Sequence, residues 1–208
     1  MPNFDIEQSL CTPYVFGFDE AGRGPWCGPV VAACVCFPDF KIDPTLAAQI
    51  NDSKKLTDKK RRVLFPMIQQ SGALIGIGQA SAAEIDTLNI LRATFLAMRR
   101  AKEDIERQGF SVPFALIDGN RLPKDWDIPA QCMVKGDALS LSIAAASIIA
   151  KVSRDNIMQT LAQTYPAYDW ENNAGYGTAK HIQALQTYGI TPEHRKSYAP
   201  IAALLKHA

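Results

Sequence analysis

Apolar and polar positions along the chain fall into short β-prone runs and longer stretches of helical period. The short runs are bounded by glycine, proline or polar residues, a pattern that predicts strands. We place five of them, at 14–18, 30–37, 73–80, 114–117 and 130–134. Glycine and proline fill the segment between the first two, which should therefore form a hairpin.

Apolar residues that recur every three or four positions predict helices over 58–70, 89–108, 141–164, 178–188 and 199–206. Thr57 should cap the first, and Ser81 should form a capping box with Glu84 before the second. The helix over 141–164 is apolar almost all round at its start, so it should be central and buried. The whole pattern predicts an α/β domain with helices on both faces of the sheet.

Composition excludes several other classes of protein. Of 208 residues, 47% are hydrophobic and 21% charged, as in ordinary globular proteins. We expect one domain over 1–208, with 1–13 as a loose N-terminal segment. The most apolar stretch, 139–150, is shorter than the roughly 20 residues of a membrane span, so we expect a cytoplasmic protein without membrane contact. Five cysteines without a CxxC pair should be reduced and packed in the core: Cys11, Cys27, Cys34, Cys36 and Cys132.

The net charge of +1 does not indicate a polyanionic partner, but the cations are unevenly distributed. Six of them lie within 54–62, and His194, Arg195 and Lys196 form a second group. Such groups can bind nucleic acid or can be a solvated helix face, and the sequence leaves both interpretations open.

Four carboxylates lie at or just beyond the ends of predicted strands: Asp19, Glu20, Asp118 and Asp137. Loops at strand ends are where α/β sheets collect reacting groups. Clustered carboxylates repel one another unless cations neutralise them, and oxygen ligands without cysteine or histidine favour Mg²⁺ or Mn²⁺. Taken singly, Asp118 could instead form a turn and Asp137 could cap a helix.

Asp19 and Glu20 are neighbours, and neighbours in a regular strand point to opposite faces. The glycines and proline that follow indicate that the strand ends here, which would let both reach one metal. Asp155 lies five helical turns beyond Asp137, about 27 Å away, so it should pair with Lys151 or Arg154 instead of binding the same ion.

Two glycine-flanked positions could contact a nucleic acid. Gly22, Arg23 and Gly24 offer an unobstructed backbone beside a cation, although they match neither a dinucleotide fingerprint nor a P-loop. Tyr176 stands between two glycines on an expected loop, as a stacking platform would. A packed tyrosine with a satisfied hydroxyl is the alternative.

In this order, the motifs resemble those of ribonuclease HII. The matching segments are FDEAGRGPWCGPV (18–30), NDSKKL (51–56), EIDTLNILRAT (84–94), LIDGNRLP (116–123), VKGDALSLSIAAASIIAKVSRD (134–155), GYGT (175–178) and HRKSYAP (194–200). Trp26 and Cys27 depart from the family, where small or aliphatic residues are more usual, and Thr178 stands where proline is common.

The resemblance implies a ribonuclease H-like fold, with a mixed five-stranded sheet flanked by helices on both faces. It also implies an endonuclease for RNA/DNA hybrids and for duplex DNA with embedded ribonucleotides. Such an enzyme cuts on the 5' side of the ribonucleotide and leaves a 3'-hydroxyl and a 5'-phosphate by two-metal catalysis. We expect a monomer that serves DNA replication and ribonucleotide excision repair.

The same resemblance assigns roles to residues. Four carboxylates match the family's ligands for Mg²⁺ or Mn²⁺: Asp19, Glu20, Asp118 and Asp137. The segment Gly22, Arg23 and Gly24 matches the loop that contacts the 2'-hydroxyl of the ribonucleotide. Tyr176 matches a tyrosine that stacks near the sugar after the RNA-to-DNA junction, and Ser53 and Lys54 fall in a phosphate-contacting segment. The alternatives are another nuclease or transposase of this fold and a silent hybrid-binding protein.

Overall fold

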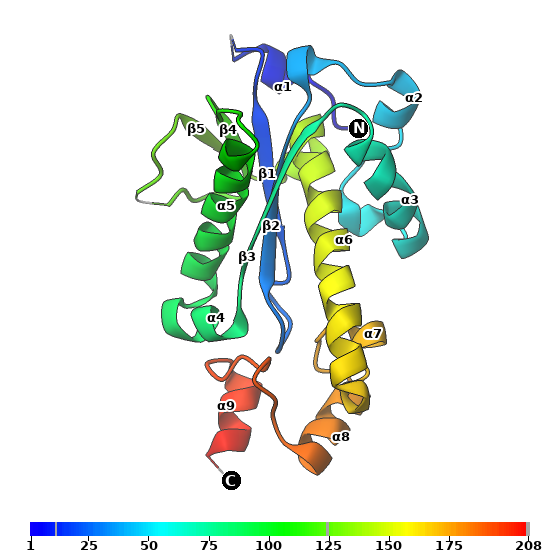
Figure 1. Ribbon diagram of the computed structural model, residues 1–208, viewed down its shortest axis with the longest axis vertical. Coiled ribbons are helices and arrows are strands. Elements are labelled where there is room, and N and C mark those ends of the chain that lie inside the picture. Colours follow the sequence, from blue (N-terminus) through cyan, green and yellow to red (C-terminus); the bar gives the residue numbers. More distant parts are fainter. Residues whose placement is uncertain (11, 124, 207–208) are drawn as a thin grey trace.

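The computed structural model describes residues 1–10, 12–123 and 125–206. At its centre is a five-stranded sheet of order β3-β2-β1-β4-β5 (Figure 1). The strands are β1 (Phe16–Ala21), β2 (Val30–Cys36), β3 (Leu74–Ala80), β4 (Ala115–Asp118) and β5 (Ala130–Met133). Strands β1, β2 and β3 pair antiparallel, whereas β4 is parallel to both β1 and β5. The predicted mixed α/β sheet is therefore confirmed.

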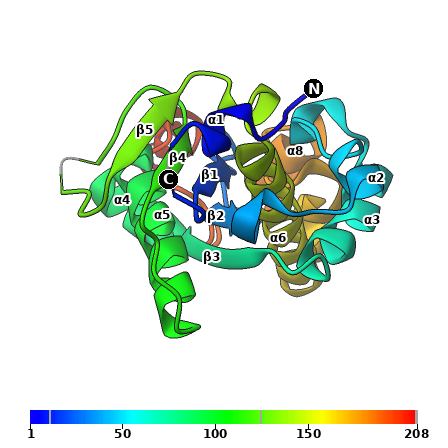
Figure 2. The same cartoon turned by 90° about the horizontal axis from the view of Figure 1, so that it is seen from above.

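Helices cover both faces of this sheet (Figures 1 and 2). On one face lie α4 (Ala82–Leu88) and α5 (Ile90–Arg107), and on the other lie α3 (Asp58–Gln69) and α6 (Leu141–Thr164). The shorter helices are α1 (Asp5–Gln8), α2 (Pro44–Ala47), α7 (Trp170–Asn173), α8 (Ala179–Tyr188) and α9 (Ala199–Leu205). Helices α7 to α9 lie beyond the end of the sheet, beside the β1–β2 connection (Figure 1).

Short 3-10 turns complete the architecture. They span Pro38–Phe40, Ser53–Lys55, Gly136–Ala138 and Pro166–Tyr168. The capping signals work as predicted, because Thr57 accepts a hydrogen bond from the backbone of Lys60, and Ser81 and Glu84 form the full capping box. Within the described residues, no helix is long and apolar enough to cross a membrane.

The alternation of side chains along β1 decides which helix each residue meets. Phe16 and Phe18 enter the hydrophobic cluster under α5. Gly17 points the other way, where a Cβ would lie only 2.2 Å from the backbone nitrogen of Ile143 in α6. Asp19, two residues further along the strand, shares this face. Helix α6 can therefore lie against β1 at backbone distance, next to Asp19.

The first residues of the chain are packed, unlike the loose segment we expected from sequence. Asn3 forms a β-bridge with Ser140, and the buried carboxylate of Glu7 accepts hydrogen bonds from Ser140 Oγ (2.6 Å) and Ser142 N (3.1 Å). Since the first N–H groups of a helix have no partner inside it, Glu7 satisfies the start of α6.

The cysteines that the structure describes are unpaired thiols. Cys27, Cys34 and Cys36 are buried, and Cys132 is half-buried. Core packing is thus confirmed for the first three, while Cys11 lies outside the described residues.

We predict that Gly17→Ala lowers the free energy of unfolding by about 2–4 kcal/mol, because the added methyl group would force α6 away from β1. Chemical denaturation measures the change. Gly109→Ala is the control, since nothing lies within 4 Å of its Cβ position, and its positive φ of 88° should cost only about 1 kcal/mol. Equal effects of the two substitutions would contradict the close contact.

Candidate active site

Three carboxylates from distant parts of the chain meet on the α6 face of the sheet. Asp19 lies in β1, Asp118 ends β4, and Asp137 lies in the turn just before α6. One carboxylate oxygen of each lies within 4.8 Å of the other two. The parallel pairing of β1 with β4 places their carboxyl ends side by side, which explains why Asp19 meets Asp118.

Glu20 lies outside this group of three, although its charge acts on Asp19 and is itself affected by Asp118. Strand β1 does not end before the two acidic residues, because Asp19 pairs with Ala33 and Glu20 with Ala32 in β2. The expectation that an early strand end frees both side chains was therefore wrong. Glu20 instead accepts a hydrogen bond from Arg23 (3.1 Å) and lines a hollow beside α5 that also contains Asp118.

The cluster carries unfavourable charge in the protein alone. Burial raises the pKa of Asp19 well above its ordinary range, and the charges of Glu20 and Asp118 raise it further. Burial and Asp118 likewise raise the pKa of Asp137. Carboxylates that are buried together resist ionisation, and a divalent cation removes this penalty. The donor set fits Mg²⁺ or Mn²⁺, which prefer oxygen ligands.

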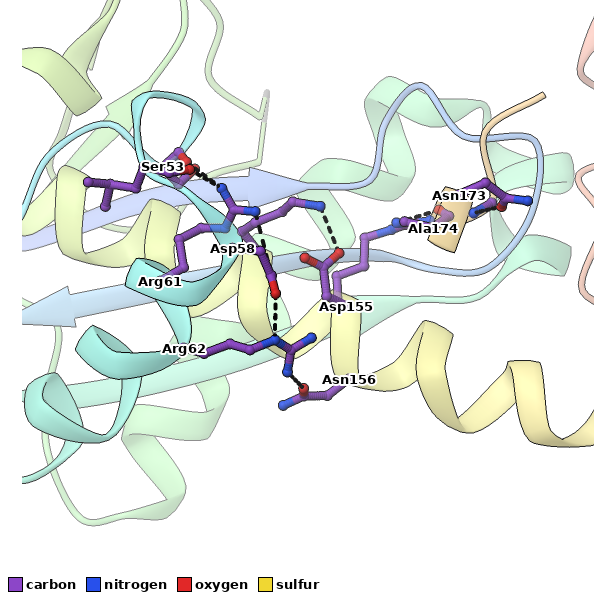
Figure 3. Close-up of polar contacts among 12 residues, drawn as sticks. Ser53, Asp58, Arg61, Arg62, Asp155, Asn156, Asn173 and Ala174 are labelled. Carbon is purple, nitrogen blue, oxygen red and sulfur yellow. Dashed lines mark hydrogen bonds and ion pairs between the residues drawn. The ribbon is translucent and has the colours of Figure 1, made fainter. Parts of the chain in front are cut away.

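Lys54 supplies part of the compensating charge. Partial burial lowers the pKa of its ammonium group, but the nearby carboxylates, led by Asp19 and Asp137, together raise it overall. The turn that carries Lys54 is fixed, because Asp52 accepts from its backbone N–H (2.8 Å) and Arg61 donates to the carbonyl of Ser53 (2.8 Å; Figure 3). Ser53 is buried and Lys54 exposed, so the ammonium group is the more accessible of the two.

A cleft of about 570 Å³ adjoins the carboxylates. Its lining includes every residue that the sequence assigns to substrate binding, together with Glu20: Gly22, Arg23, Gly24, Ser53, Lys54 and Tyr176. The ring of Tyr176 is half exposed and lies 3.5 Å from the position that a Cβ on Gly24 would occupy. The structure therefore gathers these residues around one cleft.

The two groups of cations differ in their surroundings. His194 and Arg195 are almost fully buried, so they do not form an exposed basic patch, and no local sequence pattern indicates that they fold inward. In the first group, Arg62 contacts Asp58 and Asn156 along the surface of α3 and α6 (Figure 3). Both sequence interpretations therefore fail for His194 and Arg195, whereas Lys196 is exposed.

Asp155 lies away from the carboxylate cluster. Its carboxylate accepts a hydrogen bond from Lys151 (2.7 Å), one helical turn earlier on α6 (Figure 3). The predicted pairing along the helix is confirmed.

Two buried histidines form a chain of hydrogen bonds that begins at the backbone of Tyr176. His181 Nδ1 lies 2.9 Å from the carbonyl oxygen of Tyr176, which can only accept, so this nitrogen carries the proton. His181 Nε2 then accepts from Trp170 Nε1 (3.3 Å) and from His194 Nε2 (3.0 Å). His194 Nδ1 in turn accepts from the backbone of Thr191 (2.9 Å).

Cys27 lies near this histidine pair, and the three side chains could in principle hold a metal ion. Each histidine nitrogen already has a hydrogen-bond partner, however, and burial raises the pKa of Cys27 to about 12. Metal binding needs a thiolate and free imidazole lone pairs. The group therefore serves the position of Tyr176 and not a metal.

We predict that Asp19→Asn raises the melting temperature in EDTA, because it removes one of the mutually repelling carboxylates. Wild type should be stabilised by added Mn²⁺, and the variant much less. Thermal unfolding with and without Mn²⁺ measures both effects. The exposed Glu171→Gln serves as a control that should change neither value. A wild type that does not respond to Mn²⁺ would contradict the metal site.

A second prediction concerns the buried histidines. Burial and His181 lower the pKa of His194 from 6.5 to about 4, so the unfolded chain binds this proton more readily than the folded protein. Stability is complete above about pH 6.5 and falls as the pH drops toward 4. His194→Gln, which cannot titrate, should be less stable at pH 7 but should lose less on acidification. The measurement is the melting temperature of wild type and variant between pH 7 and pH 4. An equal fall in melting temperature for both proteins would contradict the role of His194.

Comparison with known proteins agrees with this geometry. The family model for ribonuclease HII matches residues 16–200. Ribonuclease HII of Rhodospirillum rubrum is 52% identical over 206 residues, covering 99% of this chain and 92% of the relative, and that of Paramagnetospirillum magneticum is 50% identical over 202 residues, covering 97% and 98%. The crystal structure of ribonuclease H2 from Pyrococcus horikoshii superposes with a TM-score of 0.69 at 25% identity, covering 93% of this chain and 98% of that one.

A ribonuclease HIII structure, Bst-RNase HIII in complex with Mn²⁺, has the same fold, with a TM-score of 0.75 at 19% identity, covering 100% of this chain and 74% of that one. The family model and the relatives each span nearly the whole chain. On this basis the chain belongs to the ribonuclease HII family of ribonuclease H enzymes.

Proposed function

We propose that the chain hydrolyses the RNA strand of RNA/DNA hybrids and also cuts duplex DNA on the 5' side of an embedded ribonucleotide, leaving a 3'-hydroxyl and a 5'-phosphate. One observation supports this most strongly. The carboxylate cluster and the cleft of Tyr176 adjoin each other through Glu20 and Arg23, which line hollows on both sides. A phosphate at the carboxylates would then place its sugar beside the glycines.

The carboxylates would hold the metal ions. Asp19, Asp118 and Asp137 have the spacing for shared coordination, and Glu20 can approach from the α5 side. When bound, Mg²⁺ or Mn²⁺ supplies Lewis acidity and an activated water for attack on phosphorus. The protein's own share is to fix these oxygens: Asp118 Oδ1 accepts from the backbone of Gly136 (2.7 Å), and Asp19 Oδ1 from that of Glu20 (2.6 Å).

The cleft supplies contacts that suit a nucleic acid. Lys54 and Arg23 offer cations to phosphates, and Tyr176 offers an exposed ring to a sugar or base. Gly24 leaves room beside that ring for a 2'-hydroxyl, the group that separates RNA from DNA. These features favour recognition of a single ribonucleotide within a duplex.

We further propose that the protein acts as a monomer in the cytoplasm, in DNA replication and ribonucleotide excision repair. The residues assigned to metal and to substrate are gathered within a single chain, which is the arrangement that a monomeric enzyme requires. The thiols of Cys27, Cys34 and Cys36 are unpaired, as is usual in a reducing compartment.

We expect Asp118→Asn to reduce cleavage of a duplex with one ribonucleotide by at least about 10³-fold, because it removes a metal ligand without changing the shape of the side chain. Binding of the uncut duplex should be retained. The assay compares wild type and variant in Mg²⁺, Mn²⁺ and EDTA.

Three results of that assay would contradict the proposal. Near-normal cleavage by Asp118→Asn would contradict the assignment of Asp118 as a metal ligand. Cutting of an all-DNA duplex would indicate another nuclease of this fold, and binding without cleavage by wild type would indicate a silent hybrid-binding protein.

Substitutions of Tyr176 test whether its ring recognises the RNA-to-DNA junction. Tyr176→Ala should lose activity on a single embedded ribonucleotide by roughly 5- to 150-fold, the equivalent of about 1–3 kcal/mol of stacking, and Tyr176→Phe should lose little. The loss should be smaller on a long hybrid, where many registers offer a scissile phosphate. Parallel cleavage assays on both substrates measure it. Equal losses for Phe and Ala would identify the hydroxyl as the working group, and equal losses on both substrates would exclude junction reading.

A further inference from the structure

Two buried arginines lie behind the connection between β1 and β2. Arg154 belongs to α6 and Arg195 precedes α9, and their relative exposures are 1% and 0%. Among the described residues, neither guanidinium forms an ion pair with a carboxylate. Burial, followed by the charge of Arg195, lowers the pKa of Arg154 to about 10, so the group remains charged at neutral pH.

The hydrogen bonds of both arginines run mainly to backbone carbonyl oxygens of residues 22–29, which we name the glycine loop. At distances of 2.6–3.1 Å the two guanidinium groups bind the carbonyls of Gly22, Arg23, Cys27, Gly28 and Pro29. Arg154 also donates to the carbonyl of Ala174 (3.0 Å), two residues before Tyr176. The arginines thus join the glycine loop to the loop of Tyr176.

Stability alone does not explain why these two arginines are buried. Burying a charge without an opposite charge costs free energy, and apolar packing of similar volume is often as stable or more so. What a guanidinium offers beyond apolar packing is a rigid planar fork of five donors, which can fix several carbonyls at once. A lysine has the same charge but not this fork.

Fixing the carbonyls also fixes the amides. In a trans peptide the C=O and N–H bonds point in opposite directions, and no cis peptide bond occurs among the residues that the structure describes. Because the carbonyls of Gly22 and Arg23 point inward to Arg195, the N–H groups of Arg23 and Gly24 point away from it. No acceptor for these two N–H groups occurs among the described residues. They are available to an oxygen in the cleft, which the same residues line.

The two glycines of the motif have different reasons to be glycine. A Cβ on Gly22 would lie 1.9 Å from Nε of Arg154, and its φ of +94° is itself unfavourable for other residues. A Cβ on Gly24 would meet only the ring of Tyr176, at 3.5 Å. Gly22 therefore makes room for the arginine behind the loop, and Gly24 makes room in front of it.

We propose that Arg195 and Arg154 are positioning residues, which hold the glycine loop by its carbonyls so that the N–H groups of Arg23 and Gly24 face a ribonucleotide. Tyr198 assists, because its hydroxyl donates to the carbonyl of Arg23 and accepts from Arg195 (3.0 Å). This inference rests on the proposed function and names the residues that set its preference for ribose.

The test measures preference for ribose by binding. Fluorescence anisotropy in EDTA at low salt gives the Kd of a duplex with one ribonucleotide and of the same duplex made only of DNA. We expect Arg195→Lys, Arg154→Lys and Tyr198→Phe each to reduce the ratio of the two constants by about five-fold or more, the equivalent of one lost hydrogen bond. Binding of the all-DNA duplex should change less than about two-fold, since the charge is kept in both lysine variants.

Arg100→Lys is the matched control. Arg100 also donates to a backbone carbonyl, that of Gln79 (2.7 Å), but it lies on α5 and bonds Glu84 instead of the glycine loop. Its substitution should lower stability without changing the ratio. Circular dichroism and melting temperature identify variants that fold, and if Arg195→Lys does not fold, Tyr198→Phe provides the milder change.

Folded variants that keep the wild-type ratio within about two-fold would overturn the positioning role while leaving the proposed function intact. An equal loss of affinity for both duplexes would overturn it too, because that pattern indicates only a weakened cleft. If wild type itself showed no preference for the ribonucleotide, the proposed function would fail together with this inference, and that result is visible before any variant is compared.

Discussion

The contact between helix α6 and strand β1 is the constraint on which the rest of the site depends. Gly17 has no side chain, so the backbone of α6 can lie directly over the strand. This contact brings Asp137, just before α6, to the face where Asp19 and Asp118 already lie. The same helix carries Arg154, from its middle, to the glycine loop. The distance between α6 and β1 therefore determines both where Asp137 lies relative to the other carboxylates and where Arg154 meets the glycine loop.

Helix α6 joins two regions of opposite charge. At its start, carboxylates gather with raised pKa values, a state that disfavours the protein alone and favours cations. Further along the helix, Arg154 is buried beside Arg195 without a carboxylate partner, and both positive charges are met mainly by backbone carbonyl oxygens. Under the proposed function, metal ions at the carboxylates would lower the cost of their mutual repulsion.

Local signals in the sequence were sufficient for most elements. Gly and Pro boundaries, the Ser81–Glu84 capping box and the helical period of 141–164 predicted strands and helices close to their observed bounds. The end of β1 could not be predicted in this way, because Glu20 stays in the strand only through pairing with Ala32 of β2. Burial of His194 and Arg195 likewise depends on partners more than ten residues away, so their sequence neighbourhood resembled a basic surface patch.

The packing of the N-terminal segment could not be predicted from local sequence either. Nothing in the local sequence of Glu7 indicates burial, since its partner Ser140 is distant in the chain. For the candidate site, the residue types and their order were sufficient to nominate the carboxylates and the glycine-flanked positions. Arg154 and Arg195 were missed because an arginine without a carboxylate partner leaves no complementary acidic residue to find in the sequence.

The long separation between Arg195 and the carbonyl of Gly22, 173 residues apart, also has a consequence for synthesis. A nascent chain that has emerged only as far as α6 already contains all the carboxylates, but its glycine loop lacks Arg195 and Tyr198. Because a domain forms its long-range contacts only after the last participating segment leaves the ribosome, the glycine loop gains its support from Arg195 and Tyr198 late in synthesis. A chain that stopped before residue 195 would contain every carboxylate of the site but would lack both supports of the loop.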